Sequence, residues 1–137
     1  MILHHTKNKG DLGVLKAKCD LFEKGYLTLS PDSEHCPFDI AIWKDGRFKT
    51  VQVKYRETHN GKVDINFRSS FSTKDGVRSK PVNKSYIDLY CIYCKNTDKC
   101  YYFDPKLFKK SATFRVETPK NNQTKGINFL EDYCEVP

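Results

Sequence analysis

The chain has 137 residues, which is enough for one domain whose hydrophobic core needs neither disulfides nor a structural metal. Hydrophobic residues make up 38% of it and charged residues 30%, a balance that excludes an intrinsically disordered chain. Lys and Arg number 24 against 17 Asp and Glu, and the resulting net charge of +7 favours nucleic acid or another anionic surface as the partner.

The first predicted element is a helix over residues 11–24, where apolar residues recur at the spacing of an amphipathic helix. Its apolar stripe consists of Leu12, Leu15, Cys19 and Phe22, widened by Val14, Ala17 and Leu21. Gly25 is expected to end the helix. We expect Asp11 at the N-cap or in the first turn, where unpaired backbone amides favour a carboxylate. Residues 26–30 then alternate and predict a short strand.

The central prediction is a β-hairpin over residues 38–55, with the sequence FDIAIWKDGRFKTVQVKY. Asp45-Gly46 suits a two-residue type I′ turn, because both central positions of that turn take a positive φ. Counting back from the turn places Asp39 opposite Gln52, with Lys54 just beyond. Side chains alternate across a strand, so Gln52 and Lys54 share one face and the valines between them share the other.

A carboxylate, an amide and an amine therefore meet at one end of an otherwise apolar hairpin, as a functional site on a stiff platform requires. Glu34, on the loop that leads into the hairpin, is close enough in sequence to reach the same site. Each of these residues also has a non-functional interpretation. The polar strand end is then ordinary exposed surface, Glu34 is a solvated loop charge, and Asp11 only caps the helix.

Four further segments follow the hairpin. Residues 63–68 alternate and predict an outer strand after an Asn60-Gly61 turn. Residues 68–84 predict a long mobile loop suited to phosphate contact, because Ser, Thr, Gly and Asn are mixed there with cationic side chains. Residues 86–93 are the most apolar run and predict a central strand buried on both faces. Residues 113–117 predict an edge strand.

The six cysteines lack the regular spacing of a secreted disulfide framework. Cys91, Cys94, Cys100 and Cys134 leave a zinc-stabilised interaction domain as an alternative. Strand alternation sends Cys91 and Cys94 to opposite faces, which favours buried free thiols instead. No apolar run approaches the ~18 residues of a membrane span, and the first residues are too polar for a signal peptide. We expect a cytoplasmic, intracellular protein with no membrane partner.

Several of these runs together resemble the PD-(D/E)xK nuclease superfamily. They are Lys9-Gly10-Asp11-Leu12-Gly13 before the helix, Ser33-Glu34-His35-x-Pro37-Phe38-Asp39 before the hairpin, and Gln52-Val53-Lys54-Tyr55 on its second strand. The likeness is stronger to the small PD-(D/E)xK endonucleases associated with group I introns, whose last motif carries Gln where most of the superfamily has Asp or Glu. It covers residues 5 to 70 in this chain.

The resemblance implies an α/β fold with a single-domain restriction-endonuclease-like core, in which the N-terminal helix packs on a mixed β-sheet. The domain would span residues 1–137, with its core at 5–104, the basic loop at 69–84, and a C-terminal strand and tail at 105–137. It also implies hydrolysis of DNA phosphodiesters with a divalent ion, Mg²⁺ or Mn²⁺, held at Asp39.

The residue types agree with that chemistry, because a hard cation on carboxylate oxygens neutralises the attacking and leaving oxygens of a phosphodiester. Gln52 would offer a neutral carbonyl oxygen to the metal or its water, and Lys54 would orient the water or stabilise the phosphorane. The acid that many relatives carry on the helix falls at Val14, which cannot bind a cation. Asp11 or Glu34 is expected to replace it.

The sequence thus predicts a Mg-dependent, homing-type endonuclease that cuts double-stranded DNA, as a homodimer or higher homo-oligomer because each chain has one site for two strands. The predicted catalytic residues are Asp39, Gln52, Lys54, Asp11 and Glu34, the metal ligands are Asp39, Gln52 and Asp11, and the DNA contacts are Lys7, Lys9, Arg56, Arg68, Arg78 and Lys80. A catalytically inactive DNA-binding module of the same fold is the alternative, because Val14 and Gln52 both reduce the acidity of the site.

Overall fold

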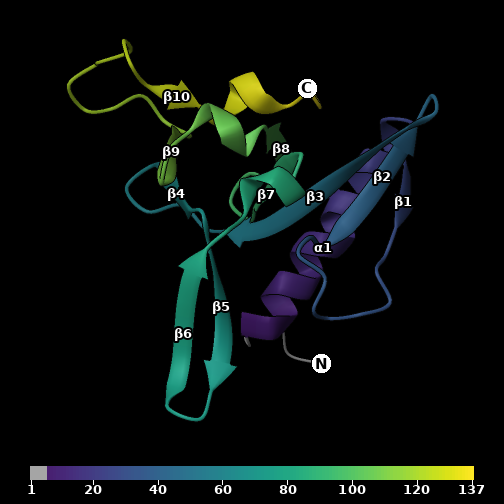
Figure 1. The fold of residues 1–137 in the computed structure, drawn as a ribbon. Helices are drawn as coiled ribbons and strands as arrows, with labels where there is room; N and C mark the ends of the chain where they lie inside the picture. The colour runs from purple at the N-terminus through teal and green to yellow at the C-terminus, as the bar shows by residue number, and fades with distance from the viewer. Residues whose placement is uncertain (1–5) are drawn as a thin grey trace.

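The structure is a computed structural model that describes residues 6–137, apart from the side chain of Ser72. The predicted start of the core at residue 5 lies just outside them. Within this range the chain forms one α-helix, ten strands in three sheets and three short 3₁₀-helices (Figure 1). Over the same residues, no helix combines the length and apolar character that crossing a membrane requires.

The largest sheet has five strands in the order β1-β2-β3-β7-β8. These strands are β1 (Leu27–Leu29), β2 (Ile40–Lys44), β3 (Arg47–Arg56), β7 (Leu89–Cys94) and β8 (Lys99–Phe103). β3 and β7 are parallel and the other neighbours antiparallel, so the sheet is mixed. Every residue of β7 is buried, which confirms the predicted strand buried on both faces, but the strand begins at Leu89 and not at residue 86.

The β2–β3 hairpin has the predicted register. Asp45 and Gly46 take φ values of 52° and 80°, and Lys44 pairs with Arg47 across this turn. Positive φ at both positions is the signature of the type I′ turn, whose twist matches that of the strands. The pairing runs back to Ile40 opposite Val51, and Asp39 stays beside β3 through hydrogen bonds to the backbone of Val51 and Val53.

Helix α1 (Thr6–Glu23) packs on one face of this sheet through a different side than the sequence predicts. Its buried residues are Gly13, Ala17 and Leu21, whereas Leu15 and Phe22 are 62% and 66% exposed. Gly13 explains the choice: a β-carbon there would lie 3.4 Å from that of Tyr55, so small residues let the helix approach β3 closely. The predicted stripe through Leu15, Cys19 and Phe22 is therefore wrong.

The other face of the large sheet is covered by a three-stranded sheet in the order β10-β9-β4. Its strands are β4 (Lys62–Asn66), β9 (Ser111–Arg115) and β10 (Asn128–Phe129). The edge position predicted for residues 113–117 is wrong, because β10 returns and pairs in parallel with β9. A second apolar cluster, rich in aromatic rings, fills the space between the two sheets. The 3₁₀-helices η1 (Lys84–Tyr86), η2 (Pro105–Leu107) and η3 (Leu130–Tyr133) connect or follow these strands.

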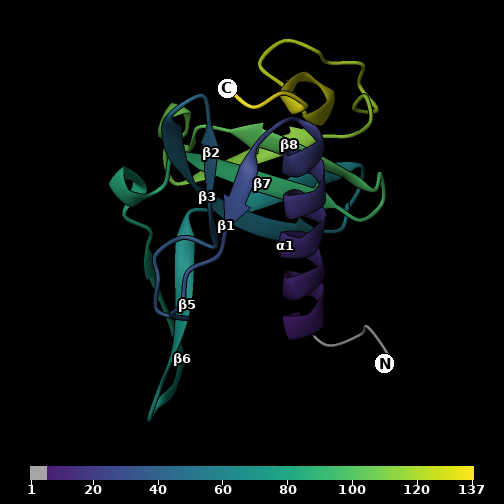
Figure 2. The same cartoon turned by 90° about the vertical axis from the view of Figure 1, so that its right-hand side faces the viewer.

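A two-stranded ribbon, β5 (Arg68–Thr73) and β6 (Gly76–Pro81), projects from the body on the side where α1 begins (Figures 1 and 2). The predicted loop over residues 69–84 is therefore wrong for most of its length. The sequence did not predict these strands because β6 has no buried residue and therefore no alternation of apolar and polar side chains. The Asp75-Gly76 pair at its tip was the available turn signal.

Candidate active site

The candidate site lies on the face of the large sheet opposite α1. Val51 and Val53 point into the apolar cluster beneath the helix, so Gln52 and Lys54 point the other way. Asp39, directly before β2, alternates with the buried Ile40 and belongs to the same face as Gln52. The structure thus brings the predicted carboxylate, amide and amine to one face of two adjacent strands.

Asp39 is held in place by the edge of β3. Its backbone N–H donates to the Val51 carbonyl oxygen at 3.0 Å, and its carboxylate Oδ2 accepts from the Val53 backbone N–H at 2.7 Å. Burial raises the pKa of the carboxyl group above its usual range, although the Val53 hydrogen bond and the charge of Lys54 act in the opposite direction. The carboxylate is therefore fixed in position and poorly solvated.

Lys54 is the half-buried cation of the site. Burial lowers the pKa of its ammonium group, the guanidinium of Arg56 lowers it further, and Asp39 raises it. Asp39 and Lys54 thus act on each other electrostatically, and burial disfavours the charged form of each. A carboxylate with a raised pKa and a neighbouring amine with a lowered pKa, here at one end of the β2–β3 hairpin, are typical of functional sites.

Arg56 and Tyr90 complete the same face. The Arg56 guanidinium is half-buried and donates to the backbone oxygens of Asp64 at 3.1 Å and Tyr55 at 2.8 Å. Tyr90 pairs with Gln52 across β3 and β7, and its buried hydroxyl has no hydrogen-bond partner. Burial and the Asp39 charge raise the pKa of Tyr90 to about 12, against an opposing effect of Arg56. No motif or spacing in the sequence distinguishes this hydroxyl from those of the other tyrosines.

The two residues predicted to replace the missing helical acid, Asp11 and Glu34, are both exposed. Asp11 is exposed and sits inside α1 rather than in its first turn, so the predicted cap position is wrong. Glu34 is exposed on the loop before β2, and Val14 packs against the apolar cluster under the helix. Among residues 6–137, no three His, Cys, Asp or Glu side chains group closely enough to hold a metal ion. The roles of Asp11 and Glu34 stay predictions.

The predicted DNA contacts fall into two groups. Lys7 and Lys9 are on the first turn of α1, and Lys9 pairs with Glu57 at 3.2 Å. Arg78 and Lys80 are exposed on the ribbon, where Arg78 lies opposite Phe71 and the Lys80 ammonium is 5.8 Å from the Phe71 ring centre. Arg68 donates to the Ser79 hydroxyl at 3.0 Å at the base of the ribbon, on the opposite ribbon face.

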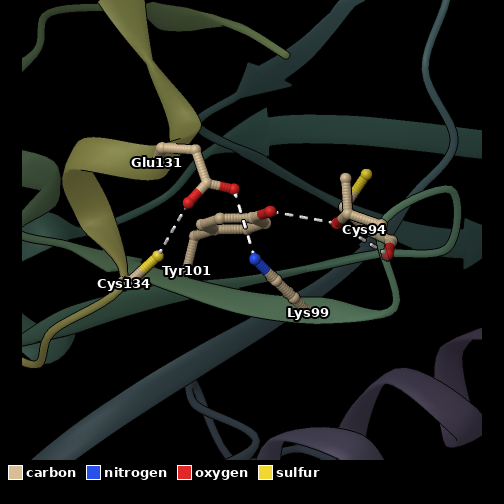
Figure 3. Close-up of polar contacts among 6 residues, drawn as sticks. Cys94, Lys99, Tyr101, Glu131 and Cys134 are labelled. Carbon is tan, nitrogen blue, oxygen red and sulfur yellow. Dashed lines mark hydrogen bonds and ion pairs between the residues drawn. The ribbon is translucent and has the colours of Figure 1, made fainter.

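The cysteines do not form the alternative zinc site. Cys91 belongs to the apolar cluster under α1 and Cys94 to the cluster on the other side of the sheet. Cys134 turns its sulfur toward Glu131, with a separation of 3.7 Å (Figure 3). The described cysteines are all free thiols, and strand alternation explains why the C-x-x-C spacing cannot close around one ion.

A mixed sheet with one helix on its first face, and a carboxylate and a lysine on adjacent strands of its second, defines a restriction-endonuclease-like α/β protein. The chain belongs to the PD-(D/E)XK endonuclease family, whose model matches residues 4–136. Among solved structures, the bacterial homing endonuclease I-Ssp6803I is similar, with a TM-score of 0.75 at 20% sequence identity over 93% of this chain and 87% of that one. A search of curated protein sequences gives no significant match.

Proposed function

We propose that the chain is a metal-dependent endonuclease that hydrolyses phosphodiester bonds in double-stranded DNA. The observation that carries the proposal is the placement of Asp39 and Lys54, which share one face of the sheet and perturb each other's ionisation. Membership of an endonuclease family supports DNA as the substrate. The net charge of +7 supports an anionic partner.

The donor set fits a hard divalent ion such as Mg²⁺ or Mn²⁺. Mg²⁺ is commonly bound through one or two carboxylates together with waters and substrate phosphates, so a single anchored carboxylate suffices. Asp39 would hold the ion through the carboxylate oxygen that Val53 does not occupy, and Gln52 would offer its carbonyl oxygen. The buried Tyr90 hydroxyl has no hydrogen-bond partner among residues 6–137, which also supports the binding of an additional oxygen-bearing group at this site. When bound, the ion would supply Lewis-acid activation of water and neutralise phosphate charge.

Lys54 has two tasks in this proposal. Its ammonium group donates hydrogen bonds to the phosphate oxygens and stabilises the negative charge that builds up on them. The lowered pKa also brings Lys54 closer to the pH at which an amine accepts a proton from attacking water. Arg56 lies on the same strand face two residues away and adds a fixed positive charge, since backbone carbonyls hold its guanidinium.

The β5–β6 ribbon is the proposed DNA-binding element. A two-stranded ribbon fits the major groove of B-form DNA, and this one projects from the side of the body where α1 begins (Figure 2). Arg78 and Lys80 on one ribbon face supply the charge, and Ser and Thr side chains supply hydrogen bonds. Lys7 and Lys9 at the start of α1 are proposed to contact the phosphate backbone outside the groove.

The homing character is also a proposal, supported by the structural similarity to a bacterial homing endonuclease and by the resemblance to enzymes of group I introns. It implies one long target site and a homodimer or higher assembly that cuts both strands. A library of plasmids with randomised inserts would test this point, because a homing enzyme should linearise only the rare members that carry a long matching site.

The direct test of the proposed function is the nicking of supercoiled plasmid in the presence of Mg²⁺. Wild type should convert the plasmid, and Asp39→Ala and Lys54→Ala should each slow conversion by about 10²-fold or more, as removal of one transition-state contact does in other enzymes. Asp32→Ala, at an exposed loop position, is the matched control and should cleave like wild type. Equal cleavage by all four proteins would contradict the proposal.

The second candidate function is a DNA-binding module without catalysis. The absence of a group of three acidic, His or Cys side chains within residues 6–137 favours it. The wild-type protein would then bind DNA with an affinity that falls steeply as salt rises, yet leave the plasmid supercoiled with either Mg²⁺ or Mn²⁺.

A further inference from the structure

Tyr90 stands at the border between the candidate site and the aromatic core. It pairs with Gln52 on one side and with Phe103 on the other, so a row of side chains crosses β3, β7 and β8. Asp39 lies beside β3 at the polar end of this row, because its carboxylate accepts from the Val53 N–H. The row therefore changes from charged at β2 to aromatic at β8, and Tyr90 is the residue at which it changes.

The ring of Tyr90 is fixed by its neighbours. Its centre lies 5.1 Å from that of Phe67 in an edge-on arrangement and 5.6 Å from that of Phe103. The residue is fully buried, at 0% exposure. Because the ring is fully buried and packed against these two rings, its hydroxyl is held away from water.

Other buried tyrosines of the same sheet each have a partner for their hydroxyl. Tyr93 donates to Asp98 at 2.6 Å, Tyr101 to the Thr97 hydroxyl at 3.0 Å, and Tyr102 to Asp20. Among the described residues with buried side-chain polar atoms, the Tyr90 hydroxyl alone lacks a hydrogen bond. Leaving a buried hydroxyl unpaired is costly, so its retention calls for a partner that arrives from outside the chain.

We propose that the Tyr90 hydroxyl donates a hydrogen bond to an oxygen that the substrate complex brings to Asp39, namely a phosphate oxygen or a water held by the cation. The inference rests on the proposed nuclease function and adds a residue to its site. The charges of Asp39 and Arg56 both act on Tyr90, which places the phenol near the polar groups of the site. The hydroxyl is buried and has no hydrogen-bond partner within the described residues, so its O–H is available to donate to an incoming oxygen.

The test compares Tyr90→Phe with Tyr101→Phe, its matched control. Each change removes one hydroxyl from a fully buried tyrosine on the face opposite α1, but of these two hydroxyls only that of Tyr101 has an internal partner, the hydroxyl of Thr97. Thermal unfolding should therefore show no loss of stability for Tyr90→Phe and a clear loss for Tyr101→Phe. Single-turnover cleavage should fall by about 10-fold or more for Tyr90→Phe, the effect of one hydrogen bond to a charged group, and stay at the wild-type rate for Tyr101→Phe.

Two binding measurements identify the oxygen. Fluorescence anisotropy of a labelled duplex without metal should show weaker binding by Tyr90→Phe if the acceptor is a phosphate oxygen. Titration with Mn²⁺ alone, followed by electron paramagnetic resonance, should show weaker metal binding if the acceptor is a cation-bound water. Either loss supports the proposal.

If Tyr90→Phe behaves like wild type in cleavage, anisotropy and Mn²⁺ titration, the proposal is wrong. The hydroxyl would then hydrogen-bond to a structural water. This outcome differs from failure of the proposed function, in which wild type itself does not cleave. The two binding measurements still decide the role of Tyr90 in that case.

Discussion

At the scale of single residues, the candidate site holds charges in surroundings that disfavour them. Burial raises the pKa of Asp39 and lowers that of Lys54, so in the free protein both charged forms are less stable than they would be in water. A cation beside the carboxylate and a phosphate beside the ammonium would reverse both effects. Such sites commonly sacrifice fold stability for function, and removing the charge then stabilises the protein.

Asp39→Asn is expected to raise the stability of the fold at pH 7 by about 0.5–2 kcal/mol, the range typical of such exchanges, while abolishing cleavage. Asn keeps an oxygen for the Val53 N–H. Because the pKa of Asp39 is raised by folding, its contribution to stability is fully present below the unfolded value near 3.8 and is lost as pH rises through the folded value. The advantage of Asn should therefore shrink as pH falls toward 4.

Thermal unfolding at several pH values checks this expectation. Asp32→Asn, at an exposed loop position, serves as the comparison and should follow wild type at each pH. If Asp39→Asn is less stable than wild type at pH 7, the attraction between Lys54 and the Asp39 carboxylate outweighs the cost of burying that carboxylate.

At the scale of secondary elements, the ribbon divides its side chains by strand alternation. Phe71, Arg78 and Lys80 share one face, while Arg68 and Ser79 share the other and bond to each other. The first face therefore carries the cations that are available for DNA, together with an aromatic ring that is 42% exposed.

Arg78→Ala should weaken DNA binding and reduce the slope of log affinity against log salt by about one, because each phosphate contact releases about one counterion. Lys106→Ala removes an equal charge from η2, at a distance from the ribbon, and should leave the slope unchanged. Anisotropy at several salt concentrations measures both variants. Equal slopes for the two variants would remove the ribbon from the interface.

Elements that are defined by a local sequence motif could be predicted, whereas those that depend on contacts between distant segments could not. The Asp45-Gly46 turn fixed the register of β2 and β3, and with it the shared face of Asp39, Gln52 and Lys54. Helix α1 has apolar residues on two sides, so periodicity could not show that Gly13 rather than Leu15 faces the sheet. The parallel pairing of β3 with β7 leaves no local mark in the sequence, and without it Tyr90 reads as an ordinary core residue.

At the scale of the whole molecule, the proposed cleavage of both DNA strands would need two sites, and each chain carries one candidate site. The sheet face that carries Asp39 exposes an apolar row across β1–β3, in which Leu27 pairs with Trp43 and Trp43 with Phe48. Leu27 is 54% and Phe48 65% exposed. A second copy of the chain is the expected cover for this row, since an assembly with two sites can cut both strands.

Light scattering should give wild type at least twice the chain mass of 16.0 kDa. Phe48→Lys should shift the protein toward the single-chain mass, because it places a charge in the apolar row. Phe22→Lys, which changes an exposed phenylalanine on the outer side of α1, is the comparison and should keep the larger mass. Dissociation by Phe22→Lys alone would place the interface on the helix instead.

At the root of the ribbon, Phe67 N–H donates to the Lys110 oxygen and Val82 N–H donates to the Phe67 oxygen. Its strands pair with each other, and β6 has no buried side chain. Substitutions within the ribbon are therefore expected to have little effect on the folding of the core. If the ribbon reads DNA as proposed, changes confined to this appendage would alter the target while the proposed catalytic residues stay constant, and grafting a foreign ribbon would change specificity.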